Sequence, residues 1–324
     1  MADEQTSLFL EDGAPRSPVH DDIAALAARL PPSLLLGTSS WTYPGWTGLI
    51  YAKPYRKTGT SAAMLREYAR YPLFRTVGVD SFFYTPPSQA TLRGYADALP
   101  AGFRCVMKVW DRITSFAKAS PRNRAAQGEL NSDWLNAALF QQAVLDPTMQ
   151  HFGDHAGPFV FEFEAIATSA RMTATRFADR LDQFFRQLPR GPEYAVEIRN
   201  ESFLAPVYFD VLREHNVAHL FNSWTHMPSI GEQLSHDSMT ADFALCRALL
   251  RPGRTYSDAV DKFSPYDRLQ EEAPEVRADL LQLVHMAARD QRRLYIVVNN
   301  RLEGSAPMTL QWLARTLLNE QPGD

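Results

Sequence analysis

Charged side chains recur at alternate positions of several apolar segments, and they are the residues of this chain best suited to acid–base chemistry. Glu197 and Arg199 lie in "YAVEIRN", Glu162 in "PFVFEFE", Lys108 in "RCVMKVW" and Arg247 in "FALCRALL". A carboxylate beside an ammonium group in a partly dry site can act as a general base while the cation stabilises developing negative charge. We therefore rank Glu197 first as a base and Lys108 as its electrostatic partner.

The remaining candidates are polar or aromatic residues at or near the ends of the same apolar segments. Asp80 and Glu162 join Glu197 and Lys108 as candidate catalytic residues. The candidate substrate-binding residues are Trp41, Tyr43, Tyr84, Arg199, Asn222, Arg247, Asn299 and Asn300. Guanidinium groups suit a carboxylate or phosphate, and an asparagine pair binds hydroxyls or, equally, satisfies loop backbone. A closed network of cations and carboxylates that only fills space remains the structural alternative.

A metal site has less support. Asp80, Glu162, Glu164 and Glu197 offer oxygen ligands for Mg²⁺ or Mn²⁺, but no inward histidine is expected beside them. No metal ligand is assigned, and the cofactor stays unknown, with a divalent metal as the less favoured option. The histidines of "HFGDH" at 151–155 are expected in a solvated, glycine-bearing loop.

These residues need a scaffold of alternating strands and helices. Strands are predicted at 34–37, 74–80, 104–110, 158–164, 194–200, 217–224, 243–250 and 294–300. Helices are predicted at 22–30, 61–70, 89–99, 132–145, 173–187, 205–215, 273–289 and 308–318. About eight such units predict a single-domain α/β fold, a TIM (β/α)8 barrel, with its site at the carboxyl ends of the strands. An open doubly wound sheet is the competitor, but no G-x-G-x-x-G follows the first strand.

Strand geometry then fixes which side chains face inward. Successive side chains of a strand point to opposite faces, so the apolar parity should pack on the helices and the charged parity should fill the barrel interior. The stretch "GTSSWTYPGWTGLIY" would form the first loop at the site, where Trp41, Tyr43 and Trp46 could build a wall against water. For Trp46 and Tyr51, a hydrophobic plug is the preferred interpretation. The two arginines of "RPGRTY" at 251–256 suit an anion or an exposed flexible loop.

Composition limits the classes of function. A net charge of -4 and a pI near 6.1 disfavour nucleic acid as a partner, and no apolar run is long enough for a membrane span. Acidic residues at the N-terminus do not match a signal peptide, so a cytoplasmic protein is expected, with Cys105 and Cys246 buried and unpaired. We expect a loose tail and short helix over 1–30, the barrel over 31–320 and a tail over 321–324. The oligomeric state is not predicted.

Four segments resemble one known family. "GTSSWTYPGWTGLIY", "TVGVDSFFYTPPSQATLRGYADALPAGFRCVMKVWDRIT", "YAVEIRNESF" and "VVNNRLEGSAP" are similar in order and spacing to the YecE-like family, named domain of unknown function 72 (DUF72). The resemblance implies a TIM barrel and no particular activity. The chain departs from the family pattern at Gly78 and Asp80, at Glu162, and after Arg247.

Two functions are carried forward. The first is an enzyme performing acid–base chemistry on a small polar or anionic substrate, sugar-like or phosphate-bearing. The second is a non-catalytic or nucleic-acid-associated binding protein that uses the aromatic first loop and basic loops such as "ASPRNR" at 119–124. An open pocket at Glu197, Lys108 and Arg247 would favour the first, and closed ion pairs under an aromatic lid would favour the second.

Overall fold

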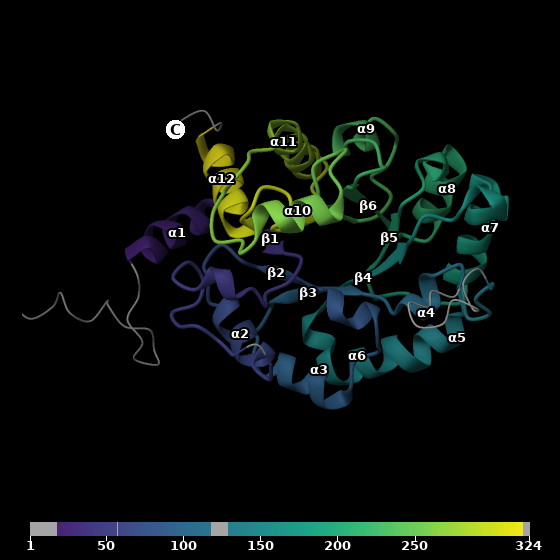
Figure 1. The fold of residues 1–324 in the computed structure, drawn as a ribbon. Coiled ribbons are helices and arrows are strands. Elements are labelled where there is room, and N and C mark those ends of the chain that lie inside the picture. The colour runs from purple at the N-terminus through teal and green to yellow at the C-terminus, as the bar shows by residue number, and fades with distance from the viewer. Residues whose placement is uncertain (1–17, 57, 118–128, 320–324) are drawn as a thin grey trace, which may run out of the picture.

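Eight parallel strands close into a barrel, with helices packed around it (Figure 1). This computed structural model describes residues 18–56, 58–117 and 129–319, so both predicted tails and the segment "ASPRNR" lie outside the described residues. The strands are β1 (Leu34–Thr38), β2 (Thr76–Val79), β3 (Arg104–Lys108), β4 (Ala156–Phe163), β5 (Tyr194–Ile198), β6 (Ala218–Ser223), β7 (Phe243–Ala248) and β8 (Arg293–Val298). Each strand pairs with the next along the chain, and β8 pairs with β1. The predicted (β/α)8 barrel is confirmed.

The helices of the described chain are as follows: α1 (Pro18–Arg29), α2 (Ser61–Tyr68), α3 (Gln89–Ala96), α4 (Asp111–Thr114), α5 (Ala137–Phe140), α6 (Asp146–Phe152), α7 (Ala174–Phe185), α8 (Pro206–Glu214), α9 (Ile230–Leu234), α10 (Tyr256–Phe263), α11 (Pro274–Arg289) and α12 (Ala306–Asn319). Within the described residues, no helix is long and apolar enough to cross a membrane. Two short helices, α9 and α10, occupy stretches after β6 and β7 that we expected to be loops.

The predicted helix at 132–145 is longer and less regular than expected. It begins at α5, passes through a π-helical turn at Gln141–Leu145 and continues as α6 to Phe152. The predicted helix ends before Pro147, but in the structure this proline directly follows the π-helical turn, where the regular α-helical hydrogen-bond pattern is already interrupted.

Helix α7 shows how the sequence builds the outer layer. The hydroxyl of Thr173 accepts a hydrogen bond from the backbone of Arg176 and caps the first turn. Phe177, Leu181 and Phe184 then recur at helical spacing and are all buried. They lie in the same core cluster as the outward-facing side chains of β4, so this apolar stripe covers the outside of the barrel.

The two parities of the strands face opposite sides of the barrel wall, as predicted, but the interior also contains an apolar cluster that was not predicted. Phe161, Val196 and Cys246 belong to the large cluster between strands and helices. A second cluster fills the barrel interior, and its members are Leu35, Val106, Val160, Ala195, Ala218, Leu220, Ala241, Phe243, Leu245, Tyr295 and Val297. Several of these apolar residues are followed, two positions later and on the same face of the strand, by a polar residue. These polar residues are Lys108, Glu162, Glu197, Asn222, Arg247 and Asn299. The interior is therefore apolar toward the amino ends and charged toward the carboxyl ends.

Candidate functional site at the carboxyl ends of the strands

Arg247 is the centre of an ion network inside the barrel. One guanidinium nitrogen, Nη1, lies 2.5 Å from Oε2 of Glu197 and 2.6 Å from Oε2 of Glu162. The other, Nη2, donates to both carboxylate oxygens of Asp80 at 3.1 Å. These three carboxylates hold the pKa of Arg247 well above its ordinary value against the opposing effect of burial. Its charge is therefore permanent and fixed in position.

Arg199 is the second buried cation of the network. Its Nη2 lies 2.5 Å from Oε1 of Glu197 and 3.3 Å from Oε2 of Glu162. The ring of Trp224 covers the guanidinium at 4.1 Å, and Nη1 donates to Asn222 at 3.4 Å. The cation–π contact and the amide hold Arg199 flat against the charged layer.

Lys108 and Glu162 form the side of the network nearest to β3 and β4. The ammonium nitrogen lies 3.0 Å from Oε2 of Glu162 and 3.8 Å from the ring centroid of Phe83. Burial alone would raise the pKa of Glu162, but Arg199, Lys108 and Arg247 together hold it well below its usual range. Glu162 therefore stays ionised at any ordinary pH.

The network contains three carboxylates and three cations, and these side chains differ in their exposure to solvent. None of the Glu197 side chain is exposed, whereas 12% of Lys108 and 35% of Asp80 are accessible. Both arginines are also buried. The ion pairs of Glu197 and Arg247 are thus closed to solvent, and Asp80 is the most accessible group of the network, so a ligand entering from solvent meets Asp80 before it meets Glu197.

The asparagines serve the surrounding backbone. Asn299 donates to the hydroxyl of Ser39 at 2.6 Å and accepts from the backbone of Arg301. Asn300 accepts from the backbone of Ala306 at 2.8 Å, at the start of α12. Both are buried, in keeping with the backbone-satisfying alternative left open from the sequence.

The aromatic side chains of the loop after β1 lie in two places, in the hydrophobic core and beside the ion network. Trp41, expected in a wall of the site, instead lies in the hydrophobic core, where its indole nitrogen donates to the carbonyl of Ser61 at 2.9 Å. Trp46 and Tyr51 are buried in the same core, so the predicted plug is confirmed. Tyr43 is only half-buried and interacts electrostatically with Asp80, which places it beside the network. Trp41 is held in the core because its indole nitrogen bonds to the first residue of α2 and its ring packs edge-on against Tyr95 of α3, with centroids 5.2 Å apart.

Tyr84 stands at the rim and is strongly exposed, at 73%. Burial of its hydroxyl end raises its pKa first, and the charges of Asp80 and Glu162 add to that rise. Its ring is free to contact a ligand above the network.

Several rim residues were not proposed as catalytic or substrate-binding residues from the sequence, and Glu164 was named there only as a possible metal ligand. Asp111 and Glu164 flank Lys108, and burial followed by charge–charge effects raises the pKa of Glu164. On the other side stand Tyr256, Tyr266 and Arg301, which interact with one another and with Tyr43. Asp111 and Tyr256 are the first residues of α4 and α10, and the others lie in loops, so all of them stand beyond the ends of the observed strands. Only the position of Arg301, directly after the asparagine pair, signalled its place.

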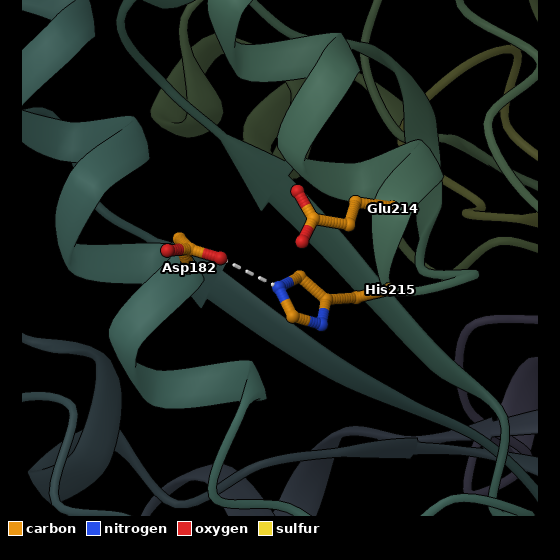
Figure 2. A group of neighbouring side chains, drawn as sticks. All are labelled: Asp182, Glu214 and His215. Carbon is orange, nitrogen blue, oxygen red and sulfur yellow. Dashed lines mark hydrogen bonds and ion pairs between the residues drawn. The ribbon is translucent and has the colours of Figure 1, made fainter.

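Metal-ligating side chains gather elsewhere among the described residues. Asp182, Glu214 and His215 approach within 4.8 Å of one another on the outside of the barrel, at α7 and the end of α8 (Figure 2). Nε2 of His215 lies 2.8 Å from Oδ1 of Asp182, and Nε of Arg186 donates to that same oxygen at 2.8 Å. Arg186 therefore already supplies the positive charge that a metal ion would bring.

The histidines of "HFGDH" are not in a solvated loop, contrary to expectation. His151 lies in α6, and His155 is buried, with Nδ1 2.9 Å from the carbonyl oxygen of Phe103. A helix replaces the loop because the apolar spacing continues to Phe152, which is itself buried.

A hollow of about 590 Å³ lies at the opposite end of the barrel, at the amino ends of β5 to β8. Glu193, Asn216 and Arg293 are among its lining residues. Glu193 is bound there by Arg293 and Tyr295. Residues at this face of a TIM barrel contribute to stability, so the hollow is not the candidate site.

The fold and the charged layer define a TIM-barrel protein with its candidate site at the carboxyl face. The family described as "Protein of unknown function DUF72" matches residues 35–323, and the chain belongs to this family. A DUF72 family protein from Enterococcus faecalis V583 is 18% identical with a TM-score of 0.59, covering 90% of this chain and 97% of that chain. One from Thermotoga maritima MSB8 is 19% identical with a TM-score of 0.59, covering 89% and 99%. At such identities the likeness shows the fold. None of the curated proteins compared with the chain matches it.

Proposed function

We propose that this protein is an enzyme that performs acid–base chemistry on a small, polar, anionic substrate at the carboxyl face of the barrel. One observation carries the proposal: in a largely buried, charge-balanced network, a carboxylate and an ammonium group, Asp80 and Lys108, keep 35% and 12% of their side chains exposed to solvent. Buried charges are costly, and an apolar core would stabilise the barrel at least as well. Their presence at the catalytic face of this fold favours a chemical role.

The exposure of each group suggests its part in the reaction. Asp80 is the carboxylate that a substrate reaches, so it is the proposed general base, and Lys108 stabilises negative charge that develops on the substrate. Glu162 remains ionised and holds Lys108 in place. Glu197, ranked first from the sequence, is the proposed positioning residue, because its carboxylate contacts Arg199 and Arg247 and no solvent.

The test is a ligand screen of the full chain by thermal shift, using hydroxylated carboxylic acids and sugar phosphates, followed by an assay of each hit for turnover. Lys108→Met and Asp80→Asn should each abolish turnover while the protein remains folded. Lys53→Met and Asp210→Asn are matched controls, because both residues are exposed and lie outside the network. Full turnover in both network variants would overturn the proposal.

A non-catalytic binding protein is the second candidate. Its supporting observation is that Arg247 and Glu197 are sealed, while Tyr84 and Tyr256 are exposed at 73% and 53%. In that case ligands, nucleic acid included, would bind through the tyrosines, with no turnover and no loss of affinity in Lys108→Met. A small molecule remains the proposed partner and the cytoplasm the proposed location, in line with the composition.

A further inference from the structure

Arg301 is a cation at the site that lacks a carboxylate partner. It follows Asn299 and Asn300 directly after β8 and is half-buried. Among the residues that the structure describes, it forms no ion pair, and its Nε is buried without a hydrogen-bond partner. Every cation of the central network has a carboxylate within 3.3 Å, so Arg301 is distinct from them. A guanidinium withdrawn from water without an opposite charge is costly, and a bound anion would remove that cost.

One tyrosine contacts this guanidinium, and two more tyrosines interact with it electrostatically. Its carbon lies 4.3 Å from the ring centroid of Tyr256, and Nη1 lies 3.4 Å from the Tyr256 hydroxyl. Tyr266 interacts electrostatically with Arg301, and its ring packs against Tyr43 with centroids 5.6 Å apart. Burial raises the pKa of Tyr43 to about 12, with Arg301 opposing and Asp80 adding to that rise. The Tyr43 hydroxyl therefore keeps its proton at neutral pH and remains a hydrogen-bond donor.

The neighbouring arginines, in contrast to Arg301, are already paired with carboxylates. Arg251 and Arg254, which the sequence suggested as anion ligands, are bound by Glu271, and Arg251 also by Glu275. Their charges are therefore satisfied within the loop after β7. Arg301 lies in the adjoining loop after β8, in the region where TIM barrels commonly hold a phosphate.

We propose that Arg301, with the hydroxyl groups of Tyr43, Tyr256 and Tyr266, binds a phosphoryl group of the substrate. A guanidinium fork and several hydroxyl donors match the three terminal oxygens of a phosphate monoester better than the two of a carboxylate. Asp80 and Arg301 both act electrostatically on Tyr43, and both follow the carboxyl ends of strands, so a phosphate here lies at the same face of the barrel as the network. The rest of the substrate then extends toward Lys108. The inference rests on the proposed function only in taking this face as the substrate site.

The probe is inorganic phosphate, titrated into the full chain by calorimetry at constant ionic strength set with chloride. Saturable binding is expected, and Arg301→Gln should weaken it at least tenfold. Arg251→Gln is the matched control and should bind phosphate as the native protein does, because that arginine is already paired. Tyr256→Phe, which removes one hydroxyl and leaves the ring, should weaken binding severalfold and serves if Arg301→Gln does not fold.

The outcomes separate this inference from the proposed function. No saturable phosphate binding, equal binding by Arg301→Gln, or tighter binding of acetate than of phosphate would each overturn the phosphate site. Lys108→Met should still bind inorganic phosphate. If it does, and phosphorylated ligands show no turnover dependent on Lys108 or Asp80, the phosphate site stands while the proposed catalysis fails.

Discussion

Glu197 and Arg247, 50 residues apart in the chain, form an ion pair of 2.5 Å inside the barrel, and the glutamate side chain has no exposed surface. β5 and β7 supply the two residues, with β6 between them. This pair therefore ties together strands that are not hydrogen-bonded to each other.

Removal of the negative charge of Glu197 should destabilise the fold. In Glu197→Gln, Arg199 and Arg247 lose a carboxylate that water cannot replace, and breaking a buried pair in this way costs about 3 kcal/mol. Urea unfolding of the variant measures the change. Glu164→Gln is the control, because Glu164 is exposed and should differ from the native protein by less than about 0.5 kcal/mol. Equal unfolding free energies for both variants would show that the pair does not stabilise the barrel.

Acid should lower the free energy of unfolding of the protein because of His219. Burial lowers its pKa from 6.5 to about 3, so the folded state binds fewer protons than the unfolded state between those values, and stability falls as pH falls through that window. The expected loss between pH 7 and pH 5 is about 2 kcal/mol. His219→Gln should flatten the pH dependence measured by urea unfolding, whereas His226→Gln, at an exposed position, should not. An unchanged slope in His219→Gln would exclude this histidine as the cause.

Gly45 holds the first loop against the loop after β7. A Cβ atom at this position would lie 2.1 Å from the carbonyl oxygen of Pro265, so Gly45→Ala must push the loops apart and displace Tyr266. Calorimetry should then show phosphate binding weakened severalfold. Gly94→Ala is the control, because its Cβ would meet nothing within 4 Å and alanine suits the helix α3. Native phosphate affinity in Gly45→Ala would contradict the proposed role of these loops.

Tyr84 should affect binding and not folding. Its side chain is 73% exposed, so Tyr84→Ala should change the unfolding free energy by less than about 0.5 kcal/mol. A ring that contacts the ligand at the rim should nevertheless contribute to affinity, and titration with a hit from the ligand screen should show a loss of about fivefold or more. Met149→Ala, at an exposed position on α6, provides the comparison. Equal affinities of the two variants would remove Tyr84 from the site.

Much of the architecture followed from the sequence because strands impose a strict period of two. The alternation in "YAVEIRN" and "PFVFEFE" placed Glu197 and Glu162 on the interior face, and the register pairs these residues on β5 and β4. Local alternation was sufficient to predict which face each side chain occupies, because alternate side chains of a barrel strand point either into the interior or toward the helices.

Depth and loop structure did not follow from the sequence. Periodicity gives the face of a side chain but not its distance from solvent, so Glu197 and Asp80 looked equivalent although only Asp80 is accessible. Loops have no period, so the burial of Trp41 and the position of Arg301 depended on tertiary contacts. Helix α10 was missed for the same reason, since its cap at Thr255 follows a glycine-bearing turn.

The apolar cluster beneath the charged layer fills the barrel interior toward the amino ends of the strands. Leu35, Val160, Leu220 and Leu245 fill the space under the ion network, so the interior offers no wet passage from the amino ends of the strands. A ligand of Lys108 or Asp80 would therefore enter and leave at the carboxyl face of the barrel. In the proposed enzyme, substrate entry and product exit would then be sequential events.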